Sequence, residues 1–183
     1  MSAVLMAMFG LALISCRGAS PEPPAVWSAD GVITDGEYAS GFSDGDYELF
    51  WLANGQYIYI GIRAKSDGWV AVGFQPKPLH RETDTVLGLV RDGEVSVFDM
   101  FSTAELGPCV ADTELGGYDD ILDFGGREEG DYTTIEFKRL LITGDEYDGE
   151  LLRGANQVIW AYSLLDDPRQ RHIARGYGVI ELR

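Results

Sequence analysis

Cysteine and histidine are scarce in this sequence of 183 residues, which contains two of each. Two cysteines are too few for a disulfide framework or for a zinc site built from cysteine. Two histidines cannot complete a closed zinc site alone, but they can supply both axial ligands of a haem. The sequence has no Cys-x-x-Cys-His motif, which excludes a covalently attached c-type haem.

Positive charge is also scarce, because 14 Lys and Arg stand against 30 Asp and Glu, for a net charge of −16. This surplus repels nucleic acid and anionic membrane surfaces, so we expect neither as a partner of the folded domain. The same negative charge suits docking to a basic redox partner protein.

A long apolar run without charge occurs at the start of the chain, over residues 1–15. It is too short to span a bilayer and predicts a secretory signal peptide. The sequence Leu-Ile-Ser-Cys that ends at Cys16 resembles a bacterial lipobox, although no Lys or Arg precedes the run. We therefore expect lipidation at Cys16 and a Pro-rich tether over 16–26. The alternative is an ordinary signal peptide with an incidental cysteine. In both cases we expect an exported protein. The lipidated form would lie in the bacterial cell envelope and face the periplasm or the cell surface. Only its acyl chains would hold it to the membrane.

Helical periodicity is missing from the rest of the chain, in which apolar runs of about 5–8 residues alternate with turns rich in Gly, Asp and Asn. Asn54-Gly55 and Asp92-Gly93 are typical hairpin turns. The pattern predicts a single all-β domain over 27–183, folded as an antiparallel β-sandwich. Its strands are expected at 47–52, 57–64, 69–74, 85–90, 95–100, 133–139, 158–163 and 178–182.

The two histidines, His80 and His172, lie in polar loops beside expected strands. Their separation in the sequence does not by itself bring them together, and a lone histidine in a loop is most often solvated.

Several motifs in order resemble the DOMON domain. They include GWVAVGF at 68–74, TDTVLG at 83–88, TTIEFKR at 133–139 and IWAY at 159–162. The resemblance covers roughly 27–182. It implies an immunoglobulin-like β-sandwich that binds either haem b or a sugar and is not itself an enzyme.

The resemblance also implies haem ligands. In haem-binding members one axial ligand is commonly a Met four residues before the Asp of the second motif, here Asp84, and the other is a His shortly before the final strand. His80 and His172 stand at these two positions. His in place of Met predicts an iron held by two histidines, with a lower reduction potential than a Met/His pair gives. Such a six-coordinate iron has no open position for substrate, so the expected function is electron transfer.

Further residues could complete such a site. The aromatic and thioether side chains of Trp69, Phe74, Met100 and Trp160 are candidates to line an apolar slot, and Met100 is a spare ligand candidate. Arg81 and Arg175, with Arg169 and Arg171, could pair with the haem propionates. Ordinary core packing for the first group and solvated charges for the second are the alternatives.

Two other readings remain open from the sequence. A carbohydrate-binding module would use exposed aromatic rings such as Tyr118, Tyr132, Tyr147 and Tyr177, but it leaves the placement of the histidines unexplained.

Calcium could bind the acidic loop that contains Asp112, Glu114, Asp119, Asp120 and Asp123. The spacing does not match an EF-hand, so solvated turn carboxylates are expected there and at Asp145, Glu146 and Asp148.

Overall fold

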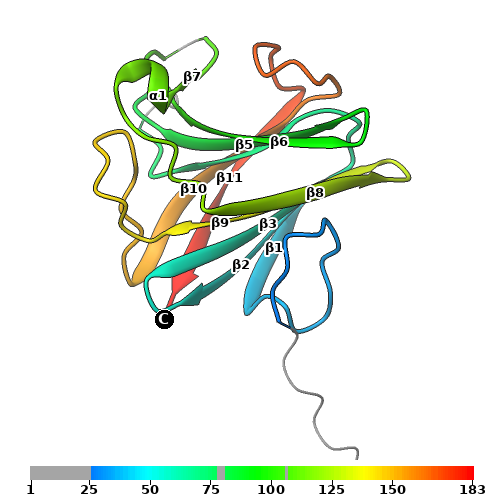
Figure 1. Cartoon of the computed structure of the whole chain (residues 1–183), viewed down its shortest axis with the longest axis horizontal. Helices are drawn as coiled ribbons and strands as arrows, with labels where there is room; N and C mark the ends of the chain where they lie inside the picture. The colour runs from blue at the N-terminus through cyan, green and yellow to red at the C-terminus, as the bar shows by residue number, and fades with distance from the viewer. Residues whose placement is uncertain (1–25, 78–80, 106) are drawn as a thin grey trace, which may run out of the picture.

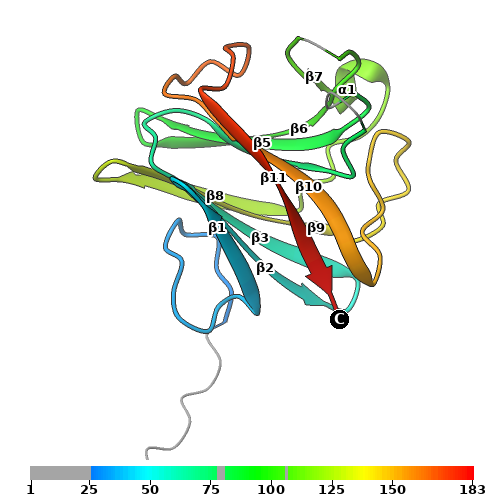
Figure 2. The same cartoon turned by 180° about the vertical axis from the view of Figure 1, so that it is seen from behind.

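The computed structural model describes residues 26–77, 81–105 and 107–183. The described chain forms two antiparallel sheets packed face to face (Figures 1 and 2). Sheet A has the order β1 (Ser40–Asp44), β2 (Tyr47–Asn54), β3 (Tyr57–Ala64), β9 (Tyr132–Leu140) and β8 (Asp123–Glu129). Sheet B has the order β11 (Ala174–Leu182), β10 (Gly154–Tyr162), β4 (Val70–Phe74), β5 (Asp84–Arg91), β6 (Glu94–Phe101) and β7 (Val110–Ala111). The expected all-β sandwich is confirmed.

All eight expected strands are present, and the structure adds β1, β7 and β8. The sequence of β8 is DFGGREE, which has two glycines, four charged residues and a single large apolar side chain. It forms a strand because its backbone pairs along its length with β9, from Asp123 opposite Lys138 to Glu129 opposite Tyr132. Tertiary pairing therefore overrides a poor strand propensity. One helical turn, α1 (Asp112–Leu115), is the only α-helix among the described residues.

The core lies between the sheets and follows from the two-residue period of the strands. Inward side chains of β3 alternate with outward ones, so that Ile58, Ile60 and Ile62 are fully buried. From sheet B, the ring of Trp160 faces the same core and stacks on Tyr47 at 4.7 Å between centroids. Full burial of each such side chain contributes roughly 1.5–3 kcal/mol.

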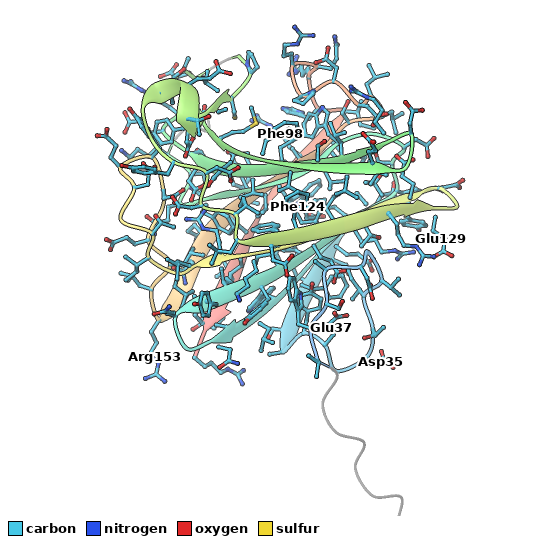
Figure 3. The ribbon with its side chains drawn as sticks, viewed as in Figure 1. Asp35, Glu37, Phe98, Phe124, Glu129 and Arg153 are labelled. Carbon is cyan, nitrogen blue, oxygen red and sulfur yellow. The ribbon has the colours of Figure 1, made fainter. Side chains whose placement is uncertain are left out.

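The outer face of sheet A is covered by the N-terminal segment, residues 26–39. Glu136 of β9 is fully buried beneath it. Its carboxylate accepts hydrogen bonds from the backbone N–H groups of Asp30 and Gly31, at 3.1 and 2.7 Å, and from the Tyr38 hydroxyl at 2.7 Å. Glu37, labelled in Figure 3, closes the segment on itself by accepting from the N–H groups of Ser28 and Thr34, at 3.1 and 2.9 Å.

The expected signal peptide, Cys16 and most of the tether fall outside the described residues. Within 26–77, 81–105 and 107–183, no helix is long and apolar enough to cross a membrane.

Candidate functional site

A cavity of about 460 Å³ lies on the outer face of sheet B. Its floor comes from β10, β4, β5 and β6. One wall includes Gly107, Pro108 and Cys109, which precede β7, and the other is the β10–β11 loop from Pro168 to His172. Figure 1 shows both connections rising from the same side of the sheet. Because residues of both line the cavity, it lies between them.

Small side chains form the centre of the floor. Strand register places Ala161 of β10 opposite Ala71 of β4, and Ala71 opposite Leu87 of β5. In the neighbouring row Gly73 of β4 lies opposite Thr85 of β5. A Cβ atom on Gly73 would lie 2.7 Å from a methyl group of Thr83 and 2.8 Å from one of Ile159, so neighbouring side chains already fill the space above this position. The lowest part of the floor is therefore formed by the small side chains of Ala71 and Ala161, with larger residues around them.

The floor is apolar. Trp69, Leu87, Leu89 and Met100 form one cluster of buried side chains with Ala71, and Phe98, Cys109 and Ala161 pack against it. Figure 3 labels Phe98 on this side of β6, away from β8 and β9. Burial raises the pKa of the Cys109 thiol, so the thiol stays protonated at neutral pH and behaves as a small apolar group. An apolar floor with a few polar groups at its border is typical of sites for cofactors and other small molecules.

The opposite wall is basic. His172 is half-buried at the border of the cavity, and Arg169, Arg171 and Arg175 line the same side. Arg169 also pairs with Asp167, at 3.1 Å between Nε and Oδ1. Three of the 14 basic residues therefore gather at one cavity in a chain of net charge −16. Such a border favours a guest that carries carboxylates.

Two indole N–H groups of residues that line the cavity are unmatched. The Nε1 atoms of Trp69 and Trp160 are buried, and no hydrogen-bond acceptor for either lies within the described part of the chain. Buried N–H groups are rarely left without an acceptor. Trp69, whose side chain belongs to the apolar floor, therefore offers a donor to a molecule bound there.

The structure brings five of the sequence-predicted site residues together, since Trp69, Met100, Trp160, His172 and Arg175 all line the cavity. Trp160 does so from the far side of the sheet, because its ring stacks in the core.

The remaining predicted residues lie elsewhere in the fold or outside the described part of the chain. Phe74 lies between the sheets, fully buried, because it is five positions from Trp69 and strand residues an odd number apart face opposite sides. Arg81 is exposed and lies 3.4 Å from Glu82. His80 falls outside the described residues. Gly73 and Thr83, which precede and follow its loop, both line the cavity.

Sequence reasoning missed the small residues Ala71, Gly73, Thr85 and Ala161. A signal for them existed in GWVAVGF, where Trp69, Ala71 and Gly73 share one face. A strand face that carries two such small residues next to a Trp indicates a hollow rather than a packed surface.

The expectation of solvated turn carboxylates is wrong for Asp112 and Asp148. Asp112 is 1% exposed, and the Asp148 side chain is 2% exposed. For Asp148 the reason is the buried guanidinium of Arg139, whose Nη2 lies 3.3 Å from Asp148 Oδ2 and holds this loop inward. Asp112 is buried at the first position of α1. Glu114, Asp119 and Asp123 are exposed, as expected.

The aromatic rings proposed for sugar binding do not form one platform. Tyr118 and Tyr177 are 72% and 60% exposed. Tyr132 instead packs under the guanidinium of Arg63 at 3.8 Å, and Tyr147 packs edge-on to Phe101 at 5.3 Å.

Comparison with curated proteins gives relatives much longer than this chain. DBH-like monooxygenase protein 1 of Mus musculus is 32% identical over 126 residues, which are 68% of this chain and 19% of the relative. The Homo sapiens protein of the same description is 30% identical over 120 residues, 66% of this chain and 19% of the relative. The chain thus spans about a fifth of the length of these relatives.

Solved structures share the fold. The cytochrome b domain of pyranose dehydrogenase from Coprinopsis cinerea superposes with a TM-score of 0.58 at 14% identity, covering 77% of this chain and 80% of that domain. The cytochrome domain of Myriococcum thermophilum cellobiose dehydrogenase gives a TM-score of 0.51 at 10% identity, covering 75% of each chain. The family model of the DOMON domain matches residues 43–163, from the end of β1 to just beyond β10. With this match over most of the sandwich, the chain belongs to the DOMON domain family.

Proposed function

We propose that this protein binds haem b in the cavity on the outer face of sheet B and serves as an electron-transfer module. The observation that carries the proposal is the cavity itself, in which an apolar floor faces a wall that holds His172 and three arginines. The cytochrome descriptions of the two structural neighbours support the same reading.

The residues present fit such a cofactor. The cavity volume of about 460 Å³ lies in the range of roughly 300–1,000 Å³ that is typical of small-molecule sites. The flat centre of Ala71, Gly73 and Ala161 suits a planar ring, and the buried Nε1 of Trp69 offers a donor to an acceptor on it. A bound haem b would supply one-electron chemistry at its iron.

Each part of the chain then has a role. The imidazole of His172 would hold the iron from the β10–β11 loop, with His80 as the second ligand. Arg171 and Arg175 would pair with the propionates through charge-assisted hydrogen bonds. Met100 and Leu87 would exclude water from the ring.

The same proposal makes this domain an electron carrier and not a catalyst. Its matched relatives are described as monooxygenases, and the match covers about a fifth of their length. We propose that it exchanges electrons with a separate basic protein partner, consistent with its net charge of −16. Export and anchoring through a lipidated Cys16 are part of this proposal.

The test is a visible spectrum of the purified protein after addition of haemin. We expect a strong Soret band, with sharp α and β bands after reduction by dithionite. His172→Ala should lose the sharp bands, and added imidazole should restore them if the lost group is a ligand. His80→Ala tests the second ligand in the same way.

Arg175→Ala should weaken haem binding at least several-fold, since it removes a charged partner of the propionates. Its matched control is Arg153→Ala, which removes the same charge from an exposed position at the far end of the sandwich (Figure 3). A folded protein that stays colourless with haemin overturns the proposal, and a glycan-binding screen would then test the carbohydrate alternative.

A further inference from the structure

A second group of functional side chains lies inside the sandwich, behind the cavity floor. Asp84 at the start of β5, Asp99 of β6 and Asp148 of the β9–β10 loop each offer a carboxylate oxygen, and these three oxygens lie within 4.8 Å of one another. Asp84 and Asp99 face inward, whereas their neighbours Thr85 and Met100 face the cavity. The acidic cluster and the cavity therefore lie on opposite faces of the same two strands.

Negative charge exceeds positive charge in this cluster. Arg139 reaches across from sheet A, with Nη1 2.8 Å from Asp84 Oδ2 and Nη2 3.3 Å from Asp148 Oδ2. Its guanidinium balances one of the three carboxylates. Asp112 of α1, with Asp120 and Asp145 of the neighbouring loops, adds further acidic groups around the same point. Buried charges in proteins are usually paired or bound to a metal ion.

Several oxygens of the cluster have no donor. Asp84 Oδ2 accepts from Arg139 and from the N–H of Gly149, and Asp99 Oδ2 accepts from the N–H of Asp120, both N–H bonds at 2.9 Å. The Oδ1 atoms of Asp84 and Asp99 are buried and meet no hydrogen-bond donor from the described chain. The two residues are only 2% and 4% exposed. The oxygens that the protein leaves unmatched thus belong to the carboxylates that converge.

The raised pKa values of these carboxyl groups reflect the same excess of negative charge. Burial, with the nearby Asp148 carboxylate, raises the pKa of Asp99 to about 8 and that of Asp112 to about 7. Burial also raises the pKa of Asp84 to about 6, against the opposing effect of Arg139. A cation would compete with protons for this site.

We infer that Asp84, Asp99 and Asp148 bind a hard divalent cation of the Ca²⁺ or Mg²⁺ class. Oxygens bound to one such ion at about 2.3–2.6 Å cannot lie more than about 5 Å apart, and the three carboxylates meet this limit. Ligands that are all oxygen favour Ca²⁺ and Mg²⁺ over Zn²⁺ or Cu²⁺, which prefer His or Cys. The inference does not depend on haem binding, since it rests on the inward face of β5 and β6.

The test is thermal unfolding of purified protein that has been stripped with EDTA, at pH 7.5, with CaCl₂ or MgCl₂ against NaCl of equal ionic strength. A cation at a hundredfold excess over its Kd should raise Tm by about 5–10 °C. Comparison of the two salts identifies the ion, because Ca²⁺ tolerates irregular geometry and Mg²⁺ requires an octahedral site.

Variants separate cation binding from general charge effects. Asp99→Asn and Asp148→Asn should abolish the cation-dependent shift in Tm. Asp131→Asn, which removes an exposed carboxylate from the β8–β9 turn next to the labelled Glu129 of Figure 3, should keep it. The Tm of metal-free Asp99→Asn should not fall, because the substitution removes a repelled charge; this distinguishes a lost ligand from a damaged fold.

A calorimetric titration gives the second readout. Binding should release protons and weaken at least tenfold between pH 7.5 and pH 5.5, as the carboxyl groups of Asp84, Asp99 and Asp112 become protonated. The other charged groups around these carboxyl groups are Asp120, Asp145, Asp148 and Arg139. Their charges also influence how strongly the site binds protons and cations. Absence of any shift in Tm beyond that of NaCl, or a full shift in Asp99→Asn, overturns the inference.

Discussion

The outer faces of the two sheets differ in what fills them. Both have small residues at the centre. On sheet A, Gly61 and Gly125 lie in one row, and the chain itself fills the space above them. A Cβ on Gly61 would lie 2.9 Å from the ring of Tyr38, and one on Gly125 would lie 1.8 Å from the carbonyl oxygen of Ala29. On sheet B, Ala71 and its neighbours form the floor of an open cavity.

The two outer faces also differ in whether their buried polar groups have hydrogen-bond partners. Above sheet A the indole N–H of Trp27 donates to the Tyr38 hydroxyl at 2.8 Å, and that hydroxyl donates to Glu136 at 2.7 Å. Above sheet B the indole N–H of Trp69 has no acceptor within the described chain. A hollow that the protein closes with matched hydrogen bonds is structural, whereas one with an unmatched donor is suited to a ligand.

The largest effect should come from removing the acceptor beneath the covered face. Glu136→Ala leaves the Tyr38 hydroxyl and the N–H groups of Asp30 and Gly31 without their acceptor. We expect a loss of about 3 kcal/mol in the free energy of unfolding. Urea unfolding measures it, and a loss below about 1 kcal/mol would mean that residues 26–39 are not held as the structure shows.

The next effect should come from filling the covered hollow. Gly125→Ala places a methyl group against the backbone of Ala29, which cannot move without displacing the segment. A loss of about 2 kcal/mol is expected from this overpacking. Gly130→Ala, at an exposed turn, is a poor control because its φ of 62° is itself unfavourable for alanine. Ala53→Gly, at the exposed end of β2, is the better reference for a small change in strand propensity.

A smaller effect concerns buried carboxylates with and without donors. Burial raises the pKa of both Glu136 and Asp99, but Glu136 has three donors that oppose the rise, whereas Asp99 has one and its pKa is raised to about 8. The folded protein therefore holds protons, between about pH 4 and pH 8, that the unfolded chain has released. In EDTA, stability should be greatest near pH 5 and fall as the pH rises to 8, by about 1–3 kcal/mol.

Asp99→Asn should flatten that profile, and Asp131→Asn should leave it unchanged. Unfolding in urea at unit steps of pH measures both. Stability that rises from pH 5 to pH 8 would contradict the raised pKa values.

The smallest change in stability should come from filling the open hollow. Ala71→Leu adds a side chain where the cavity offers space, so the free energy of unfolding should change by about 0.5 kcal/mol or less. Haemin binding, measured by the Soret band, should nevertheless fall at least tenfold. A stable variant with undiminished binding would show that the ligand does not lie on Ala71.

The fold could be predicted from the sequence because it depends on local alternation. Apolar residues at every second position and turns such as Asn54-Gly55 specify the paired strands directly. β1 and β8 could not be predicted in this way, since their short, polar sequences become strands only by pairing with β2 and β9. For the candidate site, the resemblance to the DOMON domain and not the spacing of the residues pointed to Trp69, Met100, Trp160, His172 and Arg175, which all line the cavity.

The acidic cluster could not be predicted, because its members are brought together by the packing of the sheets. Asp148 lies in a sequence of glycines and acids that is typical of a solvated turn. Its burial depends on Arg139, which comes from the other sheet and is itself 0% exposed. Nothing in the sequence indicates that Arg139, and not another basic residue, reaches from sheet A to these carboxylates.

The N-terminal segment and the cavity lie on the outer faces of different sheets. Val26 lies over the outer face of sheet A, near Trp27, Leu52 and Tyr59, and the cavity opens from the outer face of sheet B. In Figure 1 the chain enters at one pole of the molecule and the two loops that border the cavity rise at the other. The described chain therefore begins on the side of the molecule opposite the mouth of the cavity, so a connection made through Val26 would leave that mouth uncovered.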